Sequence, residues 1–154
     1  MTRTIRIQTE PFDPTSEIKK LTESKGQIGA VASFVGLVRN TADQTLVSMT
    51  LEHYPAMAIQ ELQSIASKAE EKWPLEGLTI IHRYGTLNVG EEIVLVAVAS
   101  AHREAAFAAT SYIMDYLKMD APFWKKEKTH IGEAWVSVNQ KDQQALRSWQ
   151  KKDQ

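Results

Sequence analysis

The stretch Met114-Asp-Tyr-Leu-Lys118-Met-Asp-Ala-Pro-Phe-Trp-Lys125-Lys-Glu127 marks the end of a long helix that the sequence predicts. Upstream, apolar or small residues recur on one helical face at positions 106, 107, 110, 113, 114 and 117. Pro122 disfavours the helical conformation of the residue before it, so the helix should end near residues 119–120. After it we expect a loop that turns through two aromatic residues and presents Lys125 and Lys126.

Two lysines flank this turn. Lys118 falls at the margin of the apolar face of the helix, and Lys125 lies on the expected loop. In one interpretation, both amines converge on an anion. In the other, Lys118 complements the negative end of the helix dipole and Lys125 is solvated. On this stretch alone, the second interpretation is favoured.

The overall composition is that of an ordinary globular chain. With 154 residues, 43% hydrophobic and 24% charged, the sequence suits one domain, residues 1–154, with one core. The net charge of −1 gives no indication of a nucleic-acid or membrane partner. No segment reaches the roughly 20 apolar residues of a membrane span, and the first residues do not resemble a signal peptide, so we expect a cytoplasmic protein. The absence of cysteine excludes disulfides, thiolate metal sites and a cysteine nucleophile.

The rest of the chain predicts alternating strands and helices. We expect strands near 4–8, 28–38, 46–52, 78–84, 93–99 and 134–138, helices near 15–24 and 58–73, and a closing helical turn near 143–149. The run 28–38 is nearly all apolar or small, which predicts a strand buried on both faces, with Gly29 and Gly36 at bends or close backbone approaches. It should form a hairpin with 46–52. This order of elements indicates an α+β domain.

Two cationic positions lie where predicted elements begin or end. Arg39 follows the strand 28–38, where it is either a ligand-binding cation or an arginine in an ion pair at the rim; the sequence supports both equally. Ser100 is a suitable N-cap for the long helix, but His102 and Arg103 in the first turn oppose the helix dipole unless an anion binds there. The alternative is that Glu104 pairs with Arg103 and that His102 is exposed. The anion site is slightly favoured.

The length of the helix limits how these residues can combine. Sixteen residues separate His102 from Lys118, a rise of roughly 24 Å. One helix therefore cannot bring both ends to one small molecule. Either the two sites are separate, or a second chain completes a pocket at an interface.

Other candidate sites carry less weight. The four histidines, at 53, 82, 102 and 130, have no metal-ligand spacing, so we expect no metal site. The segment 52–54 could line a cleft, although a structural role is favoured. The tryptophans are expected to be core or interface anchors.

Five segments in this order resemble the large, catalytic subunit of molybdopterin synthase, the MoaE family. They are Gly29 to Asn40, Leu51-Glu-His-Tyr-Pro55, Ile81-His-Arg-Tyr-Gly85, Ser100-Ala-His-Arg103 and Met114 to Glu127. The resemblance runs from about residue 28 to 136, and its last segment is highly specific. Residues 1–27 add an N-terminal strand and helix, and 139–154 form a C-terminal tail.

The resemblance implies an α/β-hammerhead fold with a mixed antiparallel sheet, and a heterotetramer. A central dimer of this subunit would carry a small ubiquitin-like subunit, similar to MoaD, at each end. The Gly-Gly tail of that partner, as a thiocarboxylate, would insert into the large subunit. This sulfurtransferase would pass two sulfurs to cyclic pyranopterin monophosphate to make the dithiolene of molybdopterin, without a cofactor. Because the chain has no cysteine, it cannot carry the sulfur as a persulfide.

The resemblance also implies roles for single residues. Lys118 and Lys125 match the catalytic lysines. We expect Lys118 to act as acid–base or covalent amine and Lys125 to stabilise the thiocarboxylate and the developing acyl oxyanion. The substrate-binding positions are Arg39, His102, Arg103, Lys126 and Glu127.

The chain departs from the family pattern at two positions. Many relatives carry a polar or basic residue where this chain has Leu37, and some carry arginine at the position of Asn139. One contact from a neighbouring protomer is therefore missing or replaced, with Lys141 as the candidate. Two other functions stay open at this stage: a dimer that docks a ubiquitin-like tail without turnover, and a general phosphate-binding domain.

Overall fold

The structure, a computed structural model, describes residues 1–23, 26–43, 45–120, 123–136 and 140–152. Within these ranges the elements in chain order are β1 (Thr2–Gln8), α1 (Pro14–Leu21), β2 (Ala30–Leu37), β3 (Leu46–His53), α2 (Pro55–Lys72), β4 (Gly77–Arg83), β5 (Gly85–Asn88), β6 (Glu92–Ser100), α3 (Arg103–Asp120), β7 (Phe123–Thr129), β8 (Glu133–Trp135) and α4 (Gln140–Lys152). The predicted α+β class is confirmed. None of the helices in the described ranges is long and apolar enough to cross a membrane.

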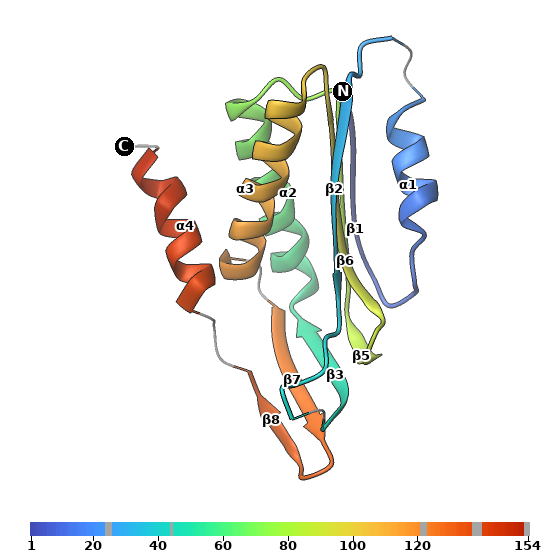
Figure 1. The fold of residues 1–154 in the computed structure, drawn as a ribbon, viewed down its shortest axis with the longest axis vertical. Helices are drawn as coiled ribbons and strands as arrows, with labels where there is room; N and C mark the ends of the chain where they lie inside the picture. The colour runs from blue at the N-terminus through green and yellow to red at the C-terminus, as the bar shows by residue number, and fades with distance from the viewer. Residues whose placement is uncertain (24–25, 44, 121–122, 137–139, 153–154) are drawn as a thin grey trace.

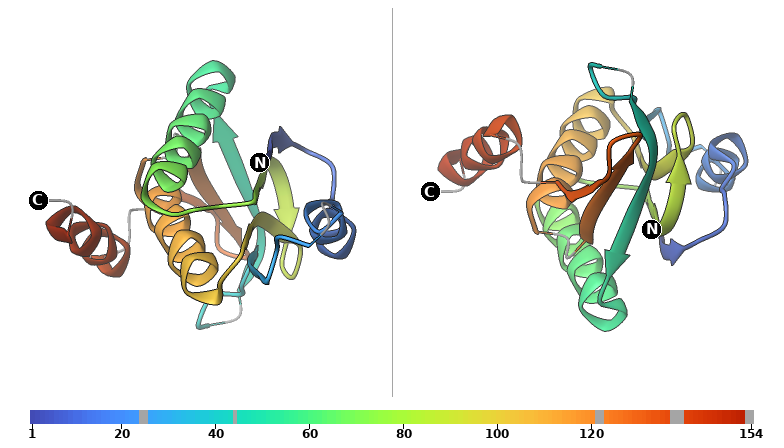
Figure 2. Two further views of the ribbon diagram at one scale, coloured as in Figure 1. Left: turned by 90° about the horizontal axis from the view of Figure 1, so that it is seen from above. Right: turned by 90° about the horizontal axis from the view of Figure 1, so that it is seen from below.

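The first sheet has the strand order β1-β4-β6-β2. β1 and β4 run parallel, and the other two pairs are antiparallel. Helices α2 and α3 cover one face, and α1 covers the other (Figure 1; Figure 2). Because helices cover both faces, the central strand β4 is buried along its whole length and β6 along most of it.

The second sheet is fully antiparallel, with the order β5-β3-β7-β8. It lies beyond the C-terminal end of α3, at the lower end of the molecule in Figure 1. A small apolar cluster, built on Val38, Leu51 and Leu87, joins it to the first sheet, with Ile93 packed against the cluster. The junction between the two sheets brings the end of α3 close to β7.

Helix α3 runs along the first sheet and ends beside the second. Its buried residues Ala109, Ile113 and Leu117 recur at helical spacing and join the main core. The helix ends at Asp120, as predicted. It begins at Arg103, so the expectation that Ser100 caps it is wrong. Ser100 is the last residue of β6, and its hydroxyl donates to the Pro74 carbonyl at 2.8 Å.

The predicted hairpin between 28–38 and 46–52 is wrong. β2 pairs with β6 in the first sheet, whereas β3 pairs with β5 and β7 in the second. β2 is therefore an edge strand and is not buried on both faces; Leu37 is 53% exposed. The expected close backbone approach is confirmed at Gly29, where a Cβ atom would collide with the Ala101 carbonyl.

The loop expected after α3 is also a strand. From Phe123 to Thr129 the chain pairs with β3, so Lys125 and Lys126 belong to β7. Residues 85–88, which lie between two predicted strands and were not predicted to be one, form β5 in the same sheet. In both cases the segment gains its hydrogen bonds from β3, a partner that is distant in sequence. Ala121 and Pro122, the expected turn, lie outside the described residues.

The C-terminal helix α4 is longer than the expected single turn. Trp149 anchors it to α3, because its Nε1 donates to Asp115 Oδ2 and its ring meets Tyr112 and Trp73 edge-on. Trp73 and Trp149 are therefore packing anchors, as predicted. Trp124 and Trp135 on the second sheet remain exposed.

Candidate functional site

A cavity of about 760 Å³ opens where the two sheets and the end of α3 meet. β2 and the residues after it form one wall, and β7 forms another. α3 contributes its last turns, and β4 contributes His82. The side chains that carry charge or polar chemistry there are Arg39, Asn40, Thr41, His82, Lys118, Lys125 and Glu127.

Lys118 and Lys125 come together in this cavity. The last turn of α3 places Lys118, and β7 places Lys125 within hydrogen-bonding reach of it. Burial, and after it the positive charge of Lys118, together lower the pKa of Lys125 to about 8. The pair thus combines a cation with an amine that is deprotonated more easily than an ordinary lysine.

Strand alternation decides which β7 side chains join the pair. Phe123, Lys125 and Glu127 line the cavity. Lys126 does not line it: its ammonium pairs with Glu133 at 2.9 Å and lies over the Trp135 ring. The resemblance implied that Lys126 is a substrate-binding residue. Within one chain, the structure places its side chain against β8, outside the cavity.

The other expected anion ligands separate into two groups. Arg39 lines the cavity, beside the exposed Leu37. His102 and Arg103 are exposed at the opposite end of α3, as its length requires (Figure 1). One protomer therefore does not bring these two residues to the lysines. Asn139 lies outside the described residues, as does the side chain of Lys141.

Sequence reasoning missed His82, which is buried in the cavity wall. Its ring stacks on Phe123 with centroids 3.8 Å apart and planes 14° apart. Its Nδ1 lies 2.8 Å from the Arg83 carbonyl oxygen. Burial lowers its pKa to about 4, and the charges of Lys125 and Lys118 act in the same direction. The only sequence signal was its place in the segment Ile81–Gly85, because a single histidine on a buried strand is usually structural.

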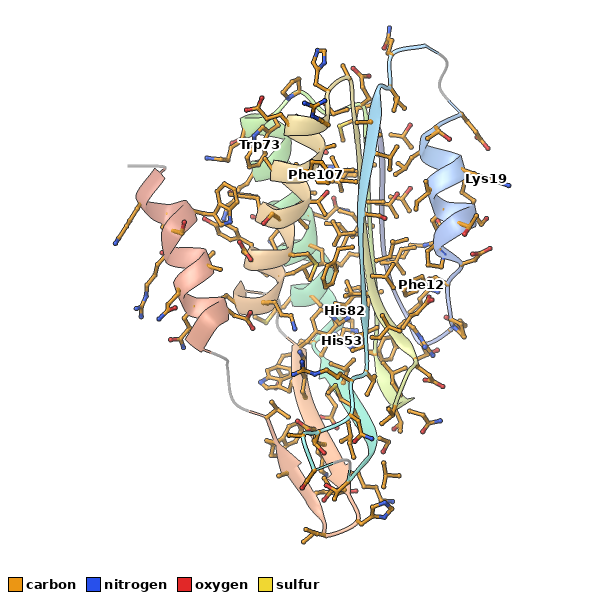
Figure 3. The ribbon with its side chains drawn as sticks, viewed as in Figure 1. Phe12, Lys19, His53, Trp73, His82 and Phe107 are labelled. Carbon is orange, nitrogen blue, oxygen red and sulfur yellow. The ribbon has the colours of Figure 1, made fainter. Side chains whose placement is uncertain are left out.

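His53, the last residue of β3, packs against the same Phe123 ring as His82. Its ring lies 5.5 Å from that of Phe123 and 4.3 Å from that of Tyr84. Burial lowers its pKa. Figure 3 shows His53 and His82 near each other at the start of β7. Among the described residues, no group of three histidines, cysteines or carboxylates is arranged to hold a metal ion.

The sequence model described as MoaE protein matches residues 7–120, which is most of the chain. The chain belongs to the MoaE family. A relative from Mesorhizobium japonicum named "Molybdopterin synthase catalytic subunit" is 51% identical over 148 residues, 95% of this chain and 92% of the relative. The solved MoaE protein of Burkholderia ambifaria is 46% identical and superposes with a TM-score of 0.82, covering 97% of this chain and 98% of that one.

A more distant solved structure shares the fold. It is a complex of subunits 1 and 2 of molybdopterin-converting factor from Helicobacter pylori, at 21% identity and a TM-score of 0.73, covering 86% of this chain and 90% of that one. The family model, the Mesorhizobium japonicum relative and the Burkholderia ambifaria structure confirm the family that the five segments predicted.

Proposed function

We propose that this MoaE-family chain is the catalytic subunit of a molybdopterin synthase. It would transfer sulfur from the thiocarboxylated C-terminus of a small ubiquitin-like subunit to cyclic pyranopterin monophosphate. The observation that carries the proposal is the Lys118–Lys125 pair, which shares one cavity with Arg39. A cytoplasmic location stays a prediction.

The charge of the cavity supports an anionic donor and an anionic acceptor. Arg39 and the two lysines supply positive charge, and a guanidinium suits a phosphate group. Apolar side chains such as Met114, Leu117 and Val94 line the remaining wall. A flexible glycine tail and a flat pterin ring can both pack against such a surface. Since the chain has no cysteine, the partner must bring the sulfur.

The transfer requires two steps for each sulfur. The thiocarboxylate sulfur attacks a substrate carbon that carries oxygen: a C–S bond forms, a C–O bond at the same carbon breaks, and the departing oxygen keeps the bonding electrons and takes a proton. The product of this step is an acyl thioester. Water then attacks the acyl carbon, the acyl C–S bond breaks, and the tail leaves as a carboxylate while the sulfur stays on the substrate. The Lys125 ammonium pairs with the thiocarboxylate and stabilises the acyl oxyanion, and Lys118 acts as acid–base or covalent amine.

The remaining anion ligands fit a pocket completed by a second protomer. His102 and Arg103 stand exposed at the far end of α3. In a central dimer, these residues of one copy would reach the substrate held by the lysines of the other. The family resemblance and the distance along the helix support this arrangement. A small subunit at each end would complete the heterotetramer.

Reconstitution tests the proposal. The chain is mixed with a thiocarboxylated small subunit and cyclic pyranopterin monophosphate, and molybdopterin is quantified. The proposal predicts product from the wild-type chain. Binding of the small subunit without product would instead support a docking module, and binding of the phosphorylated pterin without sulfur transfer would support a general phosphate-binding domain.

A further inference from the structure

His82 and Arg83, at the end of β4, have no part in the lysine chemistry. The Arg83 side chain is buried and donates three hydrogen bonds to backbone carbonyls: Nε and Nη2 to Thr9 at 3.0 and 2.8 Å, and Nη1 to Glu92 at 3.1 Å. These bonds fix the end of the strand. They thereby fix the Arg83 carbonyl that faces the His82 ring.

This carbonyl determines the tautomer of His82. A carbonyl oxygen only accepts hydrogen bonds, so His82 Nδ1, at 2.8 Å, must carry the hydrogen and donate it. In the neutral ring the lone pair then lies on Nε2. Stacking on Phe123 holds the plane of the ring in place. His82 therefore holds an acceptor in a fixed orientation.

The acceptor atom is accessible from the cavity. Among the described residues, the only sealed side-chain nitrogen or oxygen without a hydrogen-bond partner is Nε of Arg6. Nε2 of His82 has no hydrogen bond to any described residue, so it is not sealed. Since His82 lines the cavity, Nε2 is open to a ligand there.

Burial is the main reason that the His82 ring stays neutral, because it lowers the pKa of the ring. The neighbouring Lys125, Lys118 and His53, from β7, α3 and β3, oppose its protonation as well. Arg39 and Glu127 also line the cavity. Nε2 is thus a neutral hydrogen-bond acceptor in a cavity that also contains the cationic side chains of Arg39, Lys118 and Lys125. Its lone pair repels a phosphate or a thiocarboxylate and attracts an N–H group.

We propose that His82 is a substrate-binding residue whose Nε2 accepts a hydrogen bond from an N–H group of the pterin ring. The identity of this ligand rests on the proposed function. The cations hold the phosphate and the sulfur-bearing tail, and His82 recognises the ring edge. A site that presents an unprotonated acceptor binds a ring without the matching donor more weakly, because the acceptor is then left without a partner.

Two variants distinguish the contribution of the Nε2 acceptor from that of the aromatic ring of His82. His82→Phe keeps an aromatic side chain against Phe123 and removes both nitrogens. His82→Gln places an amide oxygen near the position of Nε2. In the reconstituted complex, we expect His82→Phe to raise KM for cyclic pyranopterin monophosphate about tenfold with little change in kcat, which is the effect of one lost hydrogen bond. His82→Gln should recover most of this loss, and both variants should bind the small subunit like wild type.

A wild-type measurement covers the case of a variant that fails to fold. With ¹⁵N-labelled histidine, His82 should show a protonated Nδ1 and an unprotonated Nε2. The Nε2 resonance should move upfield when cyclic pyranopterin monophosphate binds. An unmoved resonance at saturation, an unchanged KM for His82→Phe, or no recovery by His82→Gln would overturn the inference. If the wild-type chain neither binds nor converts the pterin, the proposed function itself fails.

Discussion

Lys125 is subject to two effects that act on its ammonium in the same direction. Burial removes water from the charge, and Lys118 places a second cation beside it. Both effects favour the neutral amine and lower its pKa to about 8. If the role of Lys125 depends on its positive charge, the residue therefore loses that role as the pH rises to slightly above neutral.

This pKa predicts how sulfur transfer depends on pH. If the Lys125 ammonium stabilises the thiocarboxylate and the oxyanion, the single-turnover rate should fall as pH rises through about 8, to about one tenth of its plateau at pH 9. Lys125→Arg keeps its charge throughout this range and should lack the fall. A wild-type rate that rises between pH 7 and 9 would assign Lys125 the role of a base.

The depressed pKa of His82 predicts a loss of stability in acid. Its pKa is about 4 in the folded chain and 6.5 without structure, so the unfolded chain binds more protons between these values. The contribution is fully present above pH 6.5 and is lost as pH falls to 4. Urea unfolding should show wild type losing about 3 kcal/mol more than His82→Gln between pH 7 and pH 4. Equal losses would mean that His82 is not buried in its neutral form.

At the scale of elements, β7 determines which cations share the cavity. Lys125 and Lys126 are adjacent in sequence, but only Lys125 lines the cavity, because neighbours on a strand face opposite ways. The sequence alone led us to expect a loop here, and a loop would not have separated the two lysines.

These neighbours form a matched pair of variants. Lys125→Ala should lower the single-turnover rate by at least about tenfold, whereas Lys126→Ala should change the same rate by less than about threefold. Each variant removes one positive charge from β7, so a general electrostatic effect would lower both rates equally. Such an equal loss would contradict the assignment of the two faces.

Local patterns predicted the helices and the central strands well. Leu78 to Tyr84 and Ile93 to Ala99 were recognised as strands, and the end of α3 near Asp120 followed from Pro122. Pairing between distant strands was not predictable: β2 pairs with β6, which local periodicity does not reveal. The roles of Lys118 and Lys125 came from the resemblance, and the structure added their proximity. His82 was missed because its importance depends on Arg83, Phe123 and the lysines together.

At the scale of the whole molecule, the length of α3 separates two groups of cations. Arg39, Lys118 and Lys125 share the cavity, whereas His102 and Arg103 lie exposed at the other end of the helix. If both groups serve one substrate, two copies of the chain must combine in each site.

Mixed dimers test this arrangement. In a Lys118→Ala and Arg103→Ala heterodimer, one site carries both defects and the other carries none. Random 1:1 reassembly of the two variants should therefore restore about one quarter of the wild-type activity, although each variant alone is weak. Lys118→Ala mixed with Arg39→Ala is the control, because both residues belong to the same cavity and no intact site forms. Equal recovery in both mixtures would contradict a shared site.

The same variants distinguish substrate binding from partner binding. Arg103→Ala should raise the dissociation constant for cyclic pyranopterin monophosphate about tenfold. It should leave the dissociation constant for the thiocarboxylated tail within about twofold of the wild-type value. Titration calorimetry with each component measures the two affinities separately. Equal losses of both would remove the phosphate-site assignment.

The central claim is that the Lys118–Lys125 cavity carries out the sulfur transfer. The most direct measurement is single-turnover formation of molybdopterin by Lys118→Ala, reconstituted with thiocarboxylated small subunit and cyclic pyranopterin monophosphate. Lys19→Ala, which removes an exposed cation on α1 far from the cavity, is the control (Figure 3). We predict that Lys118→Ala binds the small subunit like wild type and forms product at least about 100-fold more slowly, while Lys19→Ala matches wild type. A wild-type rate in Lys118→Ala would contradict the claim.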